Sequence, residues 1–236
     1  MKQLFILITI LIMATHVEAD SPRTNVPLIS IDNQEDFSDL ADFGRDIEGK
    51  SIIYLDELTH GEHQVFALKS RLIKYLHQHH GFDVVLLESG LFDVHEIWKN
   101  QTKSLVEQGP GNIFYAYASD HAFQDLMQYV DKYRGTPNPL FLSGFDGRLS
   151  GEHSTAHFVK TLKEVISKHL PRHQLLNDWD RYSRLLQASL ERKNLPIDNK
   201  TVSSHIDENY QLIDQLKSID AHQQFDSPAY YAQLLK

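Results

Sequence analysis

Cysteine is absent from this sequence, so disulfide bonds cannot contribute to its stability. Basic residues are outnumbered, because 23 Lys and Arg stand against 32 Asp and Glu and give a formal net charge of -9. No basic face is therefore expected, and nucleic acid is not an expected partner. Long apolar runs are missing after the first residues, so we expect no membrane contact once those residues are removed.

The first residues are typical of a secretory signal. Lys2 gives a positive start, an apolar run extends from Leu4 to Ala14, and a small-residue cleavage site ends at Ala19. The run is short for a bilayer span, and a retained amino-terminal anchor is the alternative. We expect a signal peptide over residues 1–19 and export of the chain, to the periplasm or to the exterior.

The remaining composition is that of an ordinary globular protein, with 41% hydrophobic and 23% charged residues. Strand-like apolar runs alternate with helical periodicity up to about residue 150, and only helical periodicity follows. We therefore predict an α/β fold in which helices flank a small parallel or mixed sheet, with an α-helical region in the carboxyl-terminal third. The expected divisions are 20–150 for the α/β core and 151–236 for the helical region.

An apolar run over residues 51–56 predicts a strand, which leads into the loop 57–61 and a helix that ends near His80. Two more strands are predicted over 82–87 and 139–146. Crossovers between parallel strands bring their carboxyl ends to one edge of the sheet. Each predicted strand ends in a carboxylate, and we therefore expect these carboxylates to converge at that edge. They are Glu57, Glu88 and Asp146.

The same patterns predict the other elements. A short edge strand is expected over 27–31, a helix over 36–47, and one helix over 91–108. Apolar spacing predicts a further helix that ends at Gly135, and three more helices after residue 151. Ser227 followed by Pro228 predicts the start of a last helix.

The loop after the first predicted strand carries the chemistry. His60 precedes a helix amino terminus, whose positive dipole end disfavours the imidazolium, so a neutral ring could act as a general base. Glu57 could orient that ring and stabilise the proton it acquires, and Glu88 could hold the attacking water. The spacing alone leaves two other interpretations open. One is a plain hydrogen-bonded turn, and the other is a divalent metal site formed by Glu57, His60 and His63, helped by Glu88.

Three ordered blocks carry a family resemblance: Asp56–Gly61 with the helix residues 69–76, then Gly81–Gly90, then Pro139–Asp146. They resemble the erythromycin esterase-like family, whose hallmark is a Gly-Glu-x-x-His-Gly loop followed by a Gly-Phe-Asp strand that ends in glutamate. The resemblance extends from about residue 50 to about residue 150.

The resemblance implies a hydrolase that opens a carboxylic ester or lactone of a small molecule, in a family best known for macrolide resistance. It implies His60 as the general base, Glu57 as its essential partner and Glu88 as a second active-site carboxylate. Lys69 lies where some members carry a basic residue, and we expect Lys69 and Asp146 to bind the substrate. No cofactor is expected. The alternative function is a non-catalytic protein that binds a small ligand or a metal on the same scaffold.

The sequence also departs from the family pattern. Asp56 replaces the glycine before the glutamate, and Gln64 stands where many members carry a glutamate. The family's tryptophan and glutamate pattern is not reproduced around Tyr117, Asp120 and His121. Family members continue into a late strand that bears another active-site histidine. We therefore expect this chain to correspond to the amino-terminal portion of such a protein, and to hydrolyse esters poorly as it stands.

Overall fold

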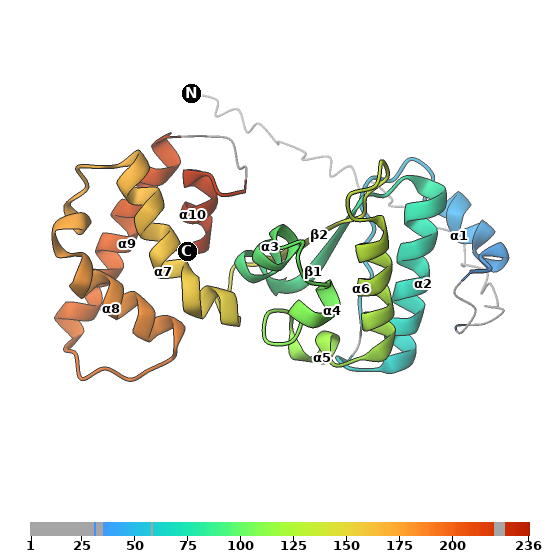
Figure 1. The fold of residues 1–236 in the computed structure, drawn as a ribbon, viewed down its shortest axis with the longest axis horizontal. Coiled ribbons are helices and arrows are strands. Elements are labelled where there is room, and N and C mark those ends of the chain that lie inside the picture. Colours follow the sequence, from blue (N-terminus) through green and yellow to red (C-terminus); the bar gives the residue numbers. More distant parts are fainter. Residues whose placement is uncertain (1–30, 32–34, 58, 220–224) are drawn as a thin grey trace, which may run out of the picture.

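The computed structural model describes residue 31 and residues 35–57, 59–219 and 225–236. The predicted signal over 1–19 lies outside the described residues, and so does the predicted strand over 27–31 apart from Ile31. Figure 1 shows an α/β part, which holds the first eight labelled helices and strands, and a helical part formed by the last four. This arrangement confirms the predicted α/β class with a helical carboxyl-terminal third.

Helix α2 (His63–His80) and helix α6 (His121–Tyr133) lie side by side in the α/β part (Figure 1). The buried Ser70 hydroxyl of α2 donates to the Ala122 carbonyl at the start of α6 over 2.9 Å. Gly81 ends α2 with φ of 71°, a left-handed conformation that glycine adopts without strain. The predicted helix that ends near His80 is therefore confirmed.

Strands β1 (Val84–Gly90) and β2 (Phe141–Asp146) form a parallel pair, as the strand–helix–strand pattern predicts. Val85 and Leu87 of β1 face the core, because side chains alternate between the two faces of a strand. A Cβ atom at Gly144 would lie 2.4 Å from the Ser89 carbonyl oxygen, so the close approach of the two strands near their carboxyl ends requires glycine.

The third predicted strand, over residues 51–56, is not formed. Residues 52–57 are irregular, and Tyr54 is 88% exposed. A strand needs a hydrogen-bonded neighbour, and among the described residues β1 pairs with β2 alone. The sheet face that includes Leu86 and Phe145 is likewise exposed. The apolar pattern of 51–56 is therefore not enough to form a strand. Among the described residues this segment does not join the sheet, and the prediction of a strand there is wrong.

The prediction of one helix over 91–108 is also wrong, because the segment divides into α3 (Leu91–Lys99) and α4 (Leu105–Gln108). The Asn100 side chain accepts hydrogen bonds from Thr102, which forms a turn between the two helices. Ser104 then caps α4 in a reciprocal capping box with Glu107. Local side-chain bonds to the backbone compete with a continuous helix and interrupt it here.

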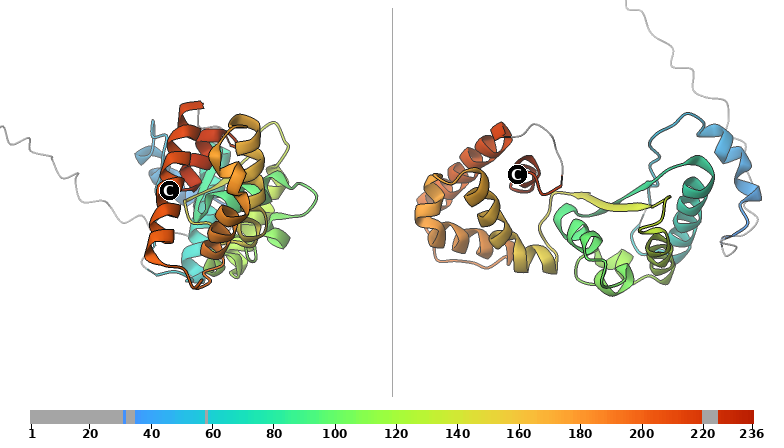
Figure 2. Two further views of the ribbon diagram at one scale, coloured as in Figure 1. Left: turned by 90° about the vertical axis from the view of Figure 1, so that its left-hand side faces the viewer. Right: turned by 45° about the horizontal axis from the view of Figure 1, so that its top comes forward.

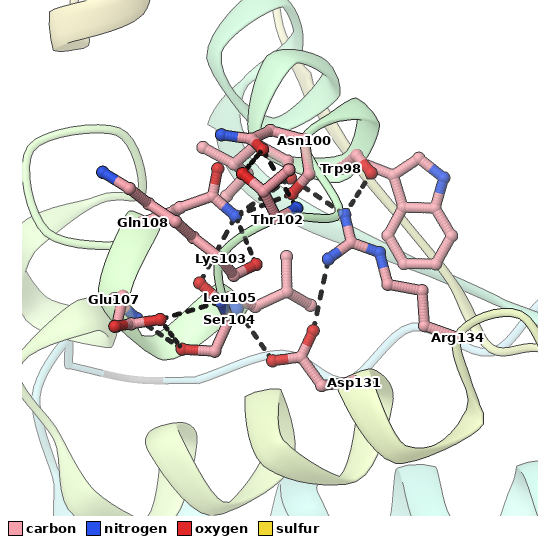
Figure 3. A network of polar contacts seen from close by, with 11 residues as sticks. Trp98, Asn100, Thr102, Lys103, Ser104, Leu105, Glu107, Gln108, Asp131 and Arg134 are labelled. Carbon is pink, nitrogen blue, oxygen red and sulfur yellow. Dashed lines mark hydrogen bonds and ion pairs between the residues drawn. The ribbon is translucent and has the colours of Figure 1, made fainter.

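Helix α6 holds this turn in place, as Figure 3 shows. Asp131 accepts from the Leu105 amide over 2.7 Å, and Arg134 donates to the Ile97 and Trp98 carbonyls. The Arg134 guanidinium also lies 4.7 Å from the centre of the Trp98 ring. These bonds satisfy carbonyls at the end of α3 and fix the positions of α3 and α4 against α6.

Three other elements complete the α/β part. The predicted helix over 36–47 is confirmed as a short 3-10 turn, Ser38–Leu40, followed by α1 (Ala41–Asp46). A buried ion pair between Arg71 of α2 and Asp39 attaches this region to α2. Helix α5 (Tyr115–Ala118) is a single turn that the sequence pattern does not predict.

The helical part contains α7 (Glu152–His169), a 3-10 turn over Gln174–Asp178, and helices α8 (Trp179–Leu190), α9 (Asn199–Ile219) and α10 (Pro228–Leu234). Its own core includes Phe158, Tyr182 and Leu212. The Ser227 hydroxyl accepts from the Tyr230 amide at the start of α10, which confirms the predicted cap. No helix among the described residues is long and apolar enough to cross a membrane.

Helix α3 connects the two parts, which the right-hand view of Figure 2 separates clearly. Phe92 packs edge to face on Phe158 with ring centres 5.3 Å apart. Asp93, which is 1% exposed, accepts from the Gly151 amide over 3.1 Å and from the Ser154 amide over 2.7 Å. A carboxylate from the α/β part therefore caps the first helix of the helical part.

Candidate active site

Glu57 and His60 contact each other directly, as their sequence spacing suggests. The Nδ1 atom of His60 lies 2.5 Å from Oε1 of Glu57. The Glu57 side chain is only 6% exposed, whereas the His60 side chain is 48% exposed. The buried Glu57 carboxylate thus binds Nδ1 of His60, while solvent can reach the rest of the imidazole ring.

This contact has a consequence for the histidine tautomer. An ionised carboxylate can only accept hydrogen bonds, so Nδ1 of His60 carries the proton that it donates to Glu57. In the neutral ring, Nε2 is then the unprotonated nitrogen. That nitrogen is the group that can take a proton from water, and Glu57 would stabilise the imidazolium that results.

Lys69 completes a chain of three charged or ionisable groups. Its ammonium donates to Oε2 of Glu57 over 2.7 Å, from the seventh residue of α2. Burial alone would raise the pKa of Glu57, but hydrogen bonds from Lys69 and His60, together with their charges, outweigh burial and lower the pKa below its ordinary value. Glu57 is therefore held as a carboxylate at neutral pH.

Tyr117 of α5 faces this site, and the sequence reasoning does not assign it a role. Burial raises the pKa of Tyr117, and the charges of Glu57 and Glu88 raise it further, because its hydroxyl lies close to both carboxylates. Glu88 is exposed in β1, between the buried Leu87 and Ser89. Tyr117 thus lies close to both Glu57 and Glu88. No sequence motif marks it, because a one-turn helix has no detectable periodicity.

Aromatic rings surround the His60 imidazole. The Phe114 ring meets it edge on at 5.1 Å between centres, and the Tyr117 ring at 6.3 Å. Strand β1 positions Phe114, because the Phe114 amide donates to the buried Ser89 hydroxyl over 3.0 Å. The strand that carries Glu88 therefore also positions the aromatic wall of the site, which limits how the histidine ring can turn.

His63 does not join Glu57 and His60. Its Nδ1 atom lies 3.1 Å from Oδ2 of Asp120, whose other oxygen caps α6 through the Ala122 amide. Among the described residues, the group of three or more His, Asp or Glu side chains with ligand atoms all within 4.8 Å of one another lies elsewhere in the fold. The alternative metal set of Glu57, His60 and His63 is therefore not assembled in this structure.

Asp146 ends β2 opposite Gly90 at the end of β1, so it lies at the same strand end as Glu88. Its carboxylate forms an ion pair with the Arg148 side chain and accepts from the Arg148 amide over 3.0 Å. In the part of the chain that the structure describes, no hydrogen bond or ion pair connects Asp146 to the Glu57–His60 pair. Substrate binding by Asp146 and by Lys69 stays a prediction.

Comparison with known proteins gives four similar chains. A scan against protein-family models finds no match. A Bacillus subtilis protein described as "Putative hydrolase YbfO" is 35% identical over 100 residues, which cover 42% of this chain and 22% of that protein. The chain therefore spans less than a quarter of the length of this curated relative.

Solved structures share the fold over most of the chain. A protein from Bacillus cereus aligns with a TM-score of 0.65 at 19% identity and covers 89% of this chain. A succinoglycan biosynthesis protein aligns with a TM-score of 0.66 at 18% identity. A mutant of the erythromycin esterase EreC in its open conformation aligns with a TM-score of 0.63 at 18% identity and covers 87% of this chain.

The aligned region covers 51% of the Bacillus cereus chain and 52% of each of the other two. The chain thus spans about half the length of these solved structures. TM-scores of 0.65, 0.66 and 0.63 show a shared fold despite the low sequence identities. This chain therefore shares its fold with a group of solved structures that includes an erythromycin esterase.

Proposed function

We propose that this chain carries part of the active site of a hydrolase that opens a carboxylic ester or lactone by attack of water. His60 would be the general base, and Glu57 would hold its ring and stabilise the imidazolium. The observation that carries the proposal is the 2.5 Å contact between a half-exposed imidazole and a buried carboxylate. A hydrolase-type function is also supported by the erythromycin esterase among the similar structures and by the name of the Bacillus subtilis relative.

The other residues would act around this pair. Lys69 keeps Glu57 ionised, which a carboxylate partner of a catalytic histidine requires. Glu88 is exposed and close to Tyr117, so it could hold the attacking water beside His60. The substrate would be a small molecule that contains an ester or lactone.

The experiment is a pH-stat assay of simple esters and lactones. Because the chain spans about half of its solved relatives, both the 236-residue chain and the product of the whole gene are assayed. In whichever protein hydrolyses the substrate, His60→Ala should lower kcat by about 10² or more, typical of the loss of a general base. His157→Ala is the control, since His157 is an exposed histidine of α7.

Undiminished hydrolysis by the His60→Ala variant would refute the role of His60. Substrate binding by the whole gene product without any turnover would favour the alternative of a non-catalytic ligand-binding protein. The circular dichroism spectra of the variants must match that of the parent protein, so that a loss of activity is not a loss of folding.

A further inference from the structure

A second cluster of ligand-type side chains lies where α3 meets the start of α10. His95 and Glu96 belong to α3, and Asp226 directly precedes the cap residue of α10. One ligand atom from each side chain lies within 4.8 Å of the other two. The cluster therefore joins the α/β part to the helical part, at a place distinct from the Glu57–His60 pair.

The histidine is firmly positioned. The His95 ring is buried, stacks on Phe225 at 4.2 Å between centres with an interplanar angle of 7°, and meets Tyr230 edge on. Its Nε2 atom faces Oδ2 of Asp226 at 3.5 Å. Because the ring is sandwiched by its neighbours, Nε2 is presented to the two carboxylates without further loss of rotamer freedom.

A cation already lies between the two carboxylates. The Lys99 ammonium donates to Glu96 over 3.0 Å and to Asp226 over 3.1 Å. The Lys99 side chain is half exposed, so it can turn into solvent. An imidazole nitrogen and carboxylate oxygens thus converge at a place where a cation already lies, and both are ligand types that divalent metals accept.

An independent observation concerns Tyr230. Its side chain is buried, and among the described residues its hydroxyl has no hydrogen-bond partner. The Tyr230 ring meets the His95 ring at 5.7 Å between centres, which places this side chain beside the cluster. A buried hydroxyl without a partner destabilises the folded state, so an additional group such as a metal-bound water would be stabilising there.

We propose that His95, Glu96 and Asp226 bind a divalent transition-metal ion of the Zn²⁺ type, in exchange for the Lys99 ammonium. One imidazole nitrogen and two carboxylate oxygens suit such an ion, and water would complete the coordination. The ion would fasten α10 to α3 and so stabilise the contact between the two parts of the molecule. Its role is structural, and no step of hydrolysis depends on it.

The test is a calorimetric titration of the metal-free 236-residue chain with Zn²⁺, paired with thermal unfolding. One equivalent of Zn²⁺ should bind and raise the melting temperature. Asp226→Asn should lower the affinity by about tenfold or more, because it removes a ligand charge at a partly exposed position. Lys99→Met should raise the affinity, because it removes the competing cation.

The Lys99→Met variant separates a metal site from a simple salt bridge. If the cluster serves only as an ion pair, Lys99→Met lowers stability with or without Zn²⁺ and does not strengthen binding. His157→Gln is the control for surface histidines, since the His157 and His153 rings of α7 lie 5.9 Å apart. Absence of Zn²⁺ binding, binding unchanged by Asp226→Asn, or binding lost in His157→Gln would overturn the proposal.

Discussion

Asp93 offers a sharp test of how the two parts of the molecule hold together. Its carboxylate is 1% exposed and accepts the Gly151 and Ser154 amides at the start of α7. In Asp93→Ala both amides lose their acceptor in a buried place. Each unsatisfied donor costs about 1–3 kcal/mol, so the free energy of unfolding should fall by roughly 2–5 kcal/mol.

Asp93→Asn should cost less, because one side-chain oxygen remains. The amide nitrogen of asparagine donates and cannot accept, so one of the two bonds is lost, at about 1–3 kcal/mol. Urea unfolding followed by far-ultraviolet circular dichroism measures both values. Asp207→Asn is the matched control, because Asp207 is exposed on α9, and its replacement should change stability by less than about 0.5 kcal/mol.

The pH dependence gives a second readout for the same residue. Burial raises the pKa of Asp93 above its ordinary value of 3.8, against the effect of its hydrogen bonds. The folded protein therefore keeps this proton to a higher pH than the unfolded chain does, and the group's contribution to stability falls as the pH rises through the folded pKa. The loss of unfolding free energy caused by Asp93→Asn should thus be larger at acidic pH than at neutral pH. An Asp93→Ala deficit below about 1 kcal/mol would refute the capping role.

Two other contacts and the predicted signal each give a further test. Gly151→Ala places a Cβ atom 2.4 Å from the Asp93 carboxyl carbon and should destabilise the protein by about 1–3 kcal/mol in urea unfolding, whereas Gly147→Ala, with open space around it, should be close to neutral. Lys69→Met removes a cation that lowers the pKa of Glu57, so the acid limb of the pH–rate profile should move to higher pH; an unchanged limb would contradict the link between Lys69 and Glu57. Mass spectrometry of exported protein should find an amino terminus at Asp20, and recovery of only the unprocessed chain would contradict the proposed export.

Several elements depend on local rules and can be predicted from the order of the residues alone. Helix α2 and its end at Gly81 follow from apolar spacing and a left-handed glycine. The start of α10 follows from Ser227 and Pro228. The parallel pairing of β1 and β2 follows from the helical connection between the two strands, because a helical crossover typically joins parallel strands. The contact between Glu57 and His60 was also predictable, because only three positions separate them.

Tertiary structure decided what depends on distant partners. The apolar segment 51–56 looks like a strand, but a strand exists only where another backbone pairs with it. The position of Tyr117 beside Glu57 and Glu88 depends on a turn held by Ser89, and no periodicity in the sequence predicts that position.

The junction between the two parts shows the same limit most clearly. Asp93 reaches amides 58 and 61 positions later, and His95 faces Asp226 across 131 positions. Sequence patterns report which face of an element is apolar. They do not report which distant element covers that face, because many distant partners could bury the same apolar face, and only the packed fold selects one of them.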